Sequence, residues 1–304
     1  MGKDFSTSIQ ETKRYPFKAS ISDLRMQYWP LIKSLQTGLL MATGVAGYMS
    51  ARCPVIYWSN LLGLAGSLFL TISGSTMLNM WYDQDIDAKM QRTCNRPLSA
   101  GKVSPQQVLR LGLVMSVVGM LWAGILSPLY ALVVFAGWFF DVAIYTLWLK
   151  RRTAWSIVWG GIAGAMPVLA GRVLGTGQVD WIGLALGLAV LFWIPTHILT
   201  FSMRYYEDYQ GAGLPTFPGS YGFSATRLTI AVASVLAGLA MGTAALGLGL
   251  TQGTLHLLGL LSGGLLVLAV YSQLRPSDRV NFTLFKYASL YMMFSMLLIA
   301  LTAI

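Results

Sequence analysis

The sequence predicts an all-α polytopic membrane protein, a bundle of nine transmembrane helices in a single domain. Of its 304 residues, 55% are hydrophobic and only 11% are charged, whereas a soluble domain carries about 25% charged residues. The mean hydropathy is +0.61, and the apolar residues form continuous stretches of about 20 residues, the length of a membrane-spanning helix. Basic residues gather in alternate connections between these stretches, as in a multi-pass membrane protein.

Nine apolar stretches have the length of a membrane span. They cover residues 31–51, 55–81, 105–126, 128–149, 155–175, 181–203, 225–249, 254–274 and 283–304. We expect residues 1–28, which are polar, to form a cytoplasmic N-terminal segment, and residues 29–304 to form the transmembrane domain. The two cysteines, Cys53 and Cys94, are far apart in sequence and indicate no metal or redox framework.

The basic residues divide unequally between the two sides of the predicted bundle. With nine spans, 19 of the 21 lysines and arginines lie on the side of the N-terminus, and only Arg52 and Arg172 lie on the other. Cytoplasmic loops carry the excess of Lys and Arg, so we expect a cytoplasmic N-terminus and an outside C-terminus in the inner cell membrane. This topology explains most of the net charge of +10 without a nucleic-acid partner.

The second span ends in a cluster of carboxylates, in a chain that has only 11 acidic residues. If the helix continues, Asn79, Asp83 and Asp87 lie within an arc of about 80°, while Asp85 points elsewhere. Stacked carboxylates repel one another unless a cation lies near them, and Mg²⁺ is shared between a few carboxylates and substrate phosphates. The alternative is a solvated helix end that is balanced by basic residues.

Arginines follow these carboxylates directly, at Arg92 and Arg96. A guanidinium is a planar fork that matches the oxygens of a phosphate group. A diphosphate complexed with Mg²⁺ needs both kinds of residue, since the metal requires carboxylates and the phosphates require cations. The connection after the second span is therefore a candidate diphosphate site.

The fourth span carries an acidic residue at depth and ends in three basic residues. Asp141 lies nine residues before Lys150, about 13 Å further into the membrane. A charge there costs roughly 3 kcal/mol unless it is paired or hydrated. Asp141 either faces a cavity or is a protonated structural acid. Of Lys150, Arg151 and Arg152, at least one is explained by the excess of positive charge on cytoplasmic loops.

The sixth span leads to a second acidic cluster, Glu207 and Asp208. On one continuous helix, His197, Arg204 and Asp208 fall within about 40° of one another. His197 then lies about 16 Å deeper in the membrane than Asp208. Ionisable residues at such depth usually face a cavity, although a histidine that only packs is the alternative.

The spacing Asn79…Asp83…Asp87, followed by Asn95-Arg96-Pro97-Leu98 and Gly101, resembles the first aspartate-rich motif of the UbiA superfamily of intramembrane prenyltransferases. Further stretches resemble the branch of this superfamily that farnesylates protohaem IX, namely residues 83–93, 145–153, 164–167, 195–197 and 208–215. The resemblance runs from about Tyr28 to Pro218. It implies a nine-helix bundle in which both acidic clusters face a central cavity that opens to the cytoplasmic side.

The sequence departs from the superfamily pattern at two places. Met80 stands where an acidic residue often follows the motif asparagine. The second motif is commonly a spaced pair of aspartates, whereas this chain has Arg204, Glu207 and Asp208. The second departure weakens the assignment of a second Mg²⁺ ion.

The resemblance implies that farnesyl diphosphate and haem B are converted to haem O and diphosphate. It implies Mg²⁺ as cofactor, with ligands from Asn79, Asp83, Asp87 and Asp208. The residues expected to contact the diphosphate are Asn79, Arg92, Arg96, Lys150, Arg151 and Arg204. Those expected to act in catalysis are Asp83, Asp87, Lys150 and His197. His197 and Asp141 are the candidates for the acceptor side, His197 as an iron ligand or by ordering a water molecule.

Two other functions fit the sequence less well. One is a UbiA-type prenyltransferase with an aromatic acid, a chlorophyll-type alcohol or a glycerol lipid as acceptor. The other is a cation-coupled transporter, which is disfavoured because both acidic clusters lie at the cytoplasmic rim and none crosses the bundle. The expected partners are farnesyl diphosphate, haem B, membrane lipid, and a haem A synthase or oxidase assembly factor.

Overall fold

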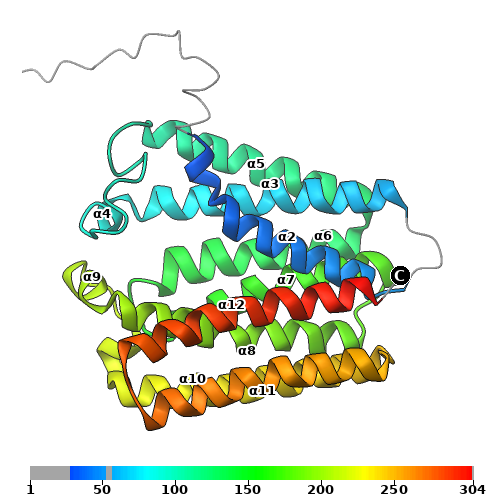
Figure 1. Cartoon of the computed structure of the whole chain (residues 1–304). Coiled ribbons are helices and arrows are strands. Elements are labelled where there is room, and N and C mark those ends of the chain that lie inside the picture. Colours follow the sequence, from blue (N-terminus) through cyan, green and yellow to red (C-terminus); the bar gives the residue numbers. More distant parts are fainter. Residues whose placement is uncertain (1–27, 53–56, 303–304) are drawn as a thin grey trace, which may run out of the picture.

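A computed structural model describes residues 28–52 and 57–302, which are helical and contain no strand. Figure 1 shows the helices side by side in one bundle. In chain order they are η1 (Trp29–Ile32), α2 (Ser34–Met49), α3 (Trp58–Tyr82), α4 (Gln84–Asp87), α5 (Pro105–Leu126), α6 (Pro128–Phe139), η2 (Phe140–Leu149), α7 (Ser156–Thr176), α8 (Trp181–Arg204), α9 (Tyr206–Gly211), α10 (Phe217–Gly247), α11 (Gln252–Leu274) and α12 (Asp278–Leu301).

Within the described residues, eight helices are long and apolar enough to cross a membrane by length and composition. They are α3, α5, α6 with η2, α7, α8, α10, α11 and α12. They correspond to the second to ninth predicted spans and confirm an all-α, multi-pass membrane protein. The predicted N-terminal segment lies, except for Tyr28, outside the described residues.

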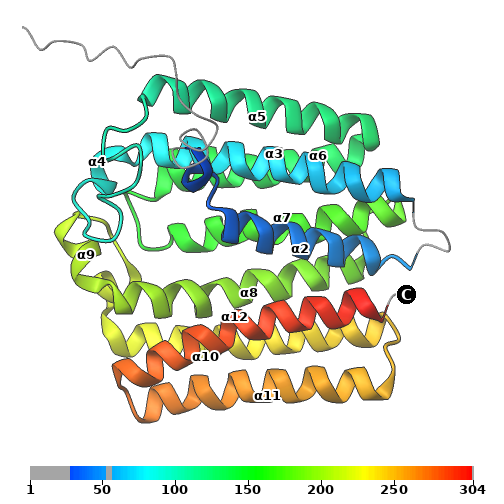
Figure 2. The ribbon, with the colours of Figure 1, turned by 45° about the horizontal axis from the view of Figure 1, so that its top comes forward.

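The first predicted span, 31–51, differs from a single long helix. It is divided into the 3₁₀ turn η1 and the 16-residue helix α2. Lys33 separates the two with a φ of 43°, a left-handed conformation that ends a helix. Because α2 is shorter than a typical span, the ninth membrane crossing stays a prediction, although α2 lies alongside the other helices (Figure 2).

Helix α7 lies between two hydrophobic clusters. One cluster is built mainly from α8, α10, α11 and α12 and includes Val168 of α7. The other is built mainly from α2, α3 and α6 and includes Leu169 and Ala170 of α7. Successive residues of α7 thus belong to different clusters, so this helix joins the two halves of the bundle.

Glycines let α2 and α7 pack backbone against backbone. A Cβ atom added to Gly171 would collide with the carbonyl oxygen of Gly44, and one added to Gly47 would collide with that of Val168. Close approach of this kind is typical of small residues at helix interfaces in membranes.

The same interface ends in a buried ion pair. Arg172 of α7 is 5% exposed, and its Nη1 donates to the carbonyl oxygen of Ser50 at 2.6 Å. Its Nε and Nη2 donate to the carboxylate of Asp180 at 2.8 and 2.5 Å. Asp180 also accepts from the backbone N–H of Gly183, at 2.8 Å, and caps α8. The hydrogen bond from Arg172 lowers the pKa of Asp180.

The two short helices α4 and α9 lie at one end of the bundle (Figure 1). They contain the residues of both predicted acidic clusters. The connection between α2 and α3 lies at the opposite end, as does the Arg172–Asp180 pair. The fold therefore brings together two acidic segments that are more than 100 residues apart in sequence.

Candidate active site

The first acidic cluster is formed where α3 ends. The helix ends at Tyr82 and does not continue through Asp87, as the sequence had suggested, and α4 begins at Gln84. The backbone N–H of Asp83 still donates to Asn79 at 3.0 Å, and that of Asp87 to Asp83 at 2.8 Å. Because these bonds join residues four apart, the three residues keep a helical spacing across the break.

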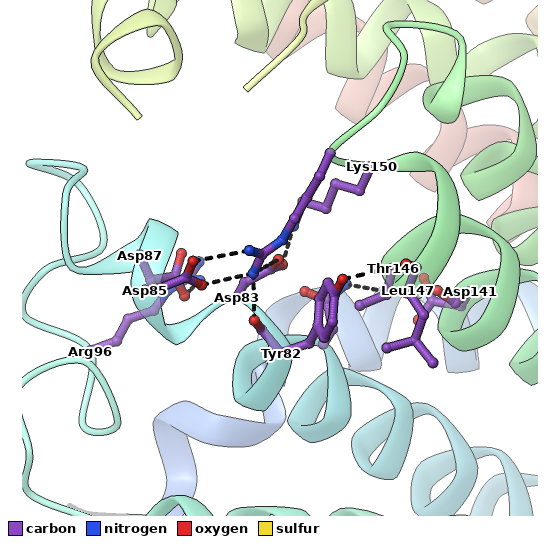
Figure 3. Close-up of polar contacts among 11 residues, drawn as sticks. Tyr82, Asp83, Asp85, Asp87, Arg96, Asp141, Thr146, Leu147 and Lys150 are labelled. Carbon is purple, nitrogen blue, oxygen red and sulfur yellow. Dashed lines mark hydrogen bonds and ion pairs between the residues drawn. The ribbon is translucent and has the colours of Figure 1, made fainter. Parts of the chain in front are cut away.

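Each buried carboxylate of this cluster is paired with a predicted diphosphate-binding cation. Asp83 is 1% exposed, and Lys150 Nζ donates to its Oδ2 (Figure 3). Asp87 is 6% exposed, and Arg96 Nη1 lies 2.5 Å from its Oδ2. The pair between Asp83 and Lys150 joins residues 67 apart in sequence.

Arg151 connects the exposed acid to the helix end. Its guanidinium donates two hydrogen bonds to Asp85, at 2.9 and 2.7 Å, and one to the carbonyl oxygen of Tyr82, at 2.6 Å. The same guanidinium lies 4.4 Å from the centre of the Tyr82 ring. Its Nη2 is 3.8 Å from Asp83 Oδ1, so Arg151 is close to both carboxylates.

The electrostatics of the cluster favour the charged forms of two residues. The hydrogen bond from Arg151 lowers the pKa of Asp85. Burial alone would lower the pKa of Lys150, but Tyr145 and Asp83 raise it above its ordinary value. The site therefore keeps a fixed positive charge at the end of η2 at neutral pH.

A π-helix, η2, packs against α3 and carries the residues that face it. Its i→i+5 pattern includes the bond from Lys150 N to Tyr145 O, at 2.8 Å. Ser75 Oγ donates to Asp141 Oδ2, and Asn79 Nδ2 donates to Thr146 Oγ1 at 3.0 Å. Asp141 is therefore hydrogen-bonded inside the helix interface, which favours the structural role over the cavity-facing one.

Asp208 joins the second acidic cluster to the first. Its Oδ1 accepts from the backbone N–H of Gln91 at 3.1 Å, and its Oδ2 accepts from that of Arg92 at 3.3 Å. The Arg92 guanidinium lies 5.0 Å from the Phe201 ring and 5.6 Å from the Tyr205 ring. The loop after α4 is thus held against the end of α8 and against α9.

His197 and Arg204 both face α12. His197 is stacked between Trp193 and Phe285, with ring centres 5.0 and 4.6 Å away, and its Nδ1 lies 3.2 Å from Ser289 Oγ. Arg204 lies 4.2 Å from the centre of the Phe282 ring.

The predicted stripe of His197, Arg204 and Asp208 does not lie on one straight helix. Helix α8 ends at Arg204, and α9 begins at Tyr206. Asp208 therefore turns away from the face that His197 and Arg204 share.

The fit of the cluster to a magnesium ion rests on oxygen atoms. No group of three or more His, Cys, Asp and Glu side chains forms a metal-binding cluster in the described part of the chain. However, Asp83 Oδ1 is buried and accepts no hydrogen bond. Oxygen atoms of carboxylates and amides are the ligands that Mg²⁺ takes, usually together with substrate phosphates. The residues at this helix end are therefore suitable for a Mg²⁺–diphosphate complex.

Sequence reasoning missed several residues that position the site. They are Ser75, Thr146, Trp193, Phe285 and Ser289. Ser75 has a pattern that would have identified it, because it precedes Asn79 and Asp83 at the same four-residue spacing. The others lie on neighbouring helices and have no such spacing.

Comparison with known proteins gives a consistent result. A family model described as the UbiA prenyltransferase family matches residues 40–297. The chain is 38% identical over 220 residues to a protoheme IX farnesyltransferase of Korarchaeum cryptofilum, covering 72% of this chain and 73% of the relative. It is 36% identical over 293 residues to one of Rhodopseudomonas palustris, covering 93% and 91%.

Solved structures share the fold at low sequence identity. A digeranylgeranylglyceryl phosphate synthase superposes with a TM-score of 0.77 at 16% identity, over 91% of this chain and 98% of the other. A UbiA homolog from Archaeoglobus fulgidus, bound to GPP and Mg²⁺, superposes with a TM-score of 0.67 at 14% identity, over 90% and 99%.

Proposed function

Since the chain belongs to the UbiA prenyltransferase family, we propose that it transfers the farnesyl group of farnesyl diphosphate to a vinyl group of haem B. The products are haem O and diphosphate. The donor and acceptor are inferred from the relatives named protoheme IX farnesyltransferase. The observation that carries the proposal is the cluster in which Asp83 and Asp87 face Lys150 and Arg96 at one end of the bundle.

On the donor side, Asn79, Asp83 and Asp87 would hold Mg²⁺. Bound Mg²⁺ would neutralise charge on the leaving diphosphate, and the A. fulgidus homolog bound to GPP and Mg²⁺ supports this assignment. We assign Asp208 to holding the loop, because both of its oxygens accept backbone hydrogen bonds.

The three paired cations supply the rest of the charge. When a Mg²⁺–diphosphate complex arrives, the carboxylates turn to the metal, and Arg96, Lys150 and Arg151 become available to the phosphate oxygens. Fixed positive charge of this kind stabilises the negative charge that develops as the diphosphate leaves. Arg92 and Arg204 lie against aromatic rings of α8 and α12 and are proposed as outer contacts.

The reaction balances with one water molecule. The bond between C1 of the farnesyl chain and the diphosphate oxygen breaks, and the electron pair leaves with the diphosphate. The terminal carbon of a haem vinyl group bonds to the resulting allylic cation. Water adds to the neighbouring carbon and loses a proton, which leaves the hydroxyl group of haem O. The apolar helices around the site limit capture of the cation by other water molecules.

The direct test supplies the purified protein with farnesyl diphosphate, Mg²⁺ and one acceptor at a time. Haem B should give a product with the mass of haem O, detected by chromatography and mass spectrometry. An aromatic acid such as 4-hydroxybenzoate and a glycerol phosphate lipid should give none. Prenylation of either alternative acceptor without any haem product would refute the proposed acceptor.

On the acceptor side, we propose that His197 contacts the haem. In the variant His197→Ala, haem affinity or the transfer rate should fall at least about tenfold, or 1.4 kcal/mol. Affinity for farnesyl diphosphate should stay within about threefold, since His197 lies deeper along α8 than the diphosphate cluster. The exposed His256 of α11 provides the matched control, and His256→Ala should leave both quantities unchanged. Loss of diphosphate binding with an unchanged haem spectrum would remove His197 from the acceptor site.

A further inference from the structure

The Thr146 hydroxyl has a single proton, and the structure shows where that proton goes. Thr146 Oγ1 donates to the carbonyl oxygen of Asp141 at 2.7 Å. Toward any other group the hydroxyl oxygen can therefore only accept. The group that it meets is the amide nitrogen of Asn79, at 3.0 Å.

This arrangement determines which way the Asn79 amide faces. An asparagine side chain has an oxygen that accepts and an NH₂ group that donates, and a half-turn about its last bond exchanges them. A hydroxyl that can only accept selects the orientation with NH₂ against Thr146. The carbonyl oxygen of Asn79, which is the atom that a cation requires, is thereby turned away from Thr146.

The π-helix makes the arrangement possible. In an α-helix, a threonine hydroxyl usually bonds the carbonyl three or four residues before it. Here Thr146 bonds the carbonyl of Asp141, five residues before it. The backbone follows the same i→i+5 pattern. Both ends of the hydrogen-bond chain are buried, with Asn79 9% and Thr146 1% exposed.

We infer that Thr146 is a positioning residue, which holds the Asn79 amide so that its oxygen is presented to the Mg²⁺–diphosphate complex. The inference rests on the proposed function only for the assignment of Asn79 as a metal ligand. Without the hydroxyl, the amide rotates freely, and in half of its orientations an NH₂ group faces the cation. The metal then binds more weakly although every ligand is still present.

The test measures Mg²⁺-dependent binding of radiolabelled inorganic pyrophosphate to the full-length protein in detergent, by equilibrium dialysis. We expect Thr146→Val, which keeps the shape of the side chain and removes the hydroxyl, to raise the half-saturating Mg²⁺ concentration about tenfold. Thr146→Ser should stay within about twofold of the wild type. Thr71→Val is the matched control, because the Thr71 hydroxyl is also buried in the bundle and bonds its own helix.

A double-mutant cycle separates positioning from packing. If Thr146 acts through Asn79, the variant that combines Asn79→Ala with Thr146→Val should bind no more weakly than Asn79→Ala alone. A full tenfold further loss would show that Thr146 acts through packing, and unchanged binding in Thr146→Val would equally overturn the inference. If the wild type shows no Mg²⁺-dependent binding, the metal assignment fails with it. Failure of the proposed farnesyl transfer appears separately, in the haem assay.

Discussion

The carboxylates at the end of α3 differ in how strongly each depends on its partner. Asp83 is 1% exposed and Asp87 is 6% exposed, whereas the Asp85 side chain is 55% exposed. Removing one member of a buried pair leaves the other charge uncompensated in a medium of low polarity. An exposed pair is screened by water and contributes little. Asp83 and Asp87 are therefore the residues whose charge the site requires.

The variant Asp83→Asn should lose prenyl transfer by about a hundredfold or more, because it removes both a proposed metal ligand and the counter-charge of Lys150. Asp85→Asn, the same change two residues away, should keep activity within about threefold of the wild type. Initial rates at saturating Mg²⁺, together with thermal unfolding in detergent, measure both effects. Equal losses in the two variants would contradict the distinction between the buried and the exposed acid.

At this scale the sequence predicted the acids better than their partners. The acids were identified because they cluster at four-residue spacing in a chain with few acidic residues. Lys150 and Arg151 were identified as cations, but nothing in the sequence pairs them with Asp83 and Asp85. Thr146 was missed because its importance depends on a hydrogen bond to Asn79, 67 residues away.

Among the elements, η2 explains how two helices with different spacings meet. On α3, residues Ser75, Asn79 and Asp83 are four apart, while their partners on η2, Asp141, Thr146 and Lys150, are five and then four apart. In an α-helix, the second set would spread over about 180°. The π-helix accommodates the additional residue, so all three partners face α3.

This geometry predicts unequal effects of two single-residue deletions. Deleting Ala143 leaves the partners four and four apart, so an ordinary α-helix can present all three to α3. We expect this variant to keep at least about a tenth of wild-type activity. Deleting Leu147 leaves spacings of five and three, which no regular helix aligns, and activity should be lost. Activity assays on folded protein check this, and a more active Leu147 deletion would contradict it.

The Arg172–Asp180 pair predicts stability at the opposite end of the bundle. Asp180→Asn should destabilise the protein by about 3 kcal/mol at neutral pH, since it leaves a buried arginine without its carboxylate. The pKa of Asp180 is lowered on folding from 3.8, so the stabilisation is present well above pH 3.8 and is lost as the pH falls through the lower folded pKa.

Thermal unfolding across that pH range should therefore show the wild type and Asp180→Asn converging in acid. Asp278→Asn, at the exposed start of α12, is the control and should shift the unfolding temperature little at any pH. A difference between wild type and Asp180→Asn that is independent of pH would show that the ion pair is not its source.

For the molecule as a whole, the apolar stretches predicted the number and order of the long helices well, because the length of a span is set by the bilayer. Their ends were predicted less well. The seventh stretch was expected to begin at residue 225, whereas α10 begins at Phe217, where the Thr216 side chain caps it, and bends at Gly222 with a φ of 80°. Polar and glycine-rich turns of helix leave no trace in an average of hydrophobicity.

Topology is the prediction that belongs to this scale. We expect reporters fused after Ile304 to lie outside, and those fused to a chain that ends at Leu274 to lie in the cytoplasm, because basic residues concentrate at that end. Paired phosphatase and fluorescent-protein fusions in cells give the measurement. A cytoplasmic C-terminus would show that α2 does not cross the membrane.

The ion pairs at the end of α3 also affect which anions the protein binds. Arg96, Lys150 and Arg151 each face a carboxylate already. A free phosphate or nucleotide from the aqueous phase would have to displace that carboxylate and leave it buried without a counter-charge, which is costly. A diphosphate that arrives with a divalent cation meets no such cost, because it brings the replacement partner for the acids. The paired site thus discriminates against abundant soluble anions, and the same pairs, as they re-form, favour the departure of spent diphosphate.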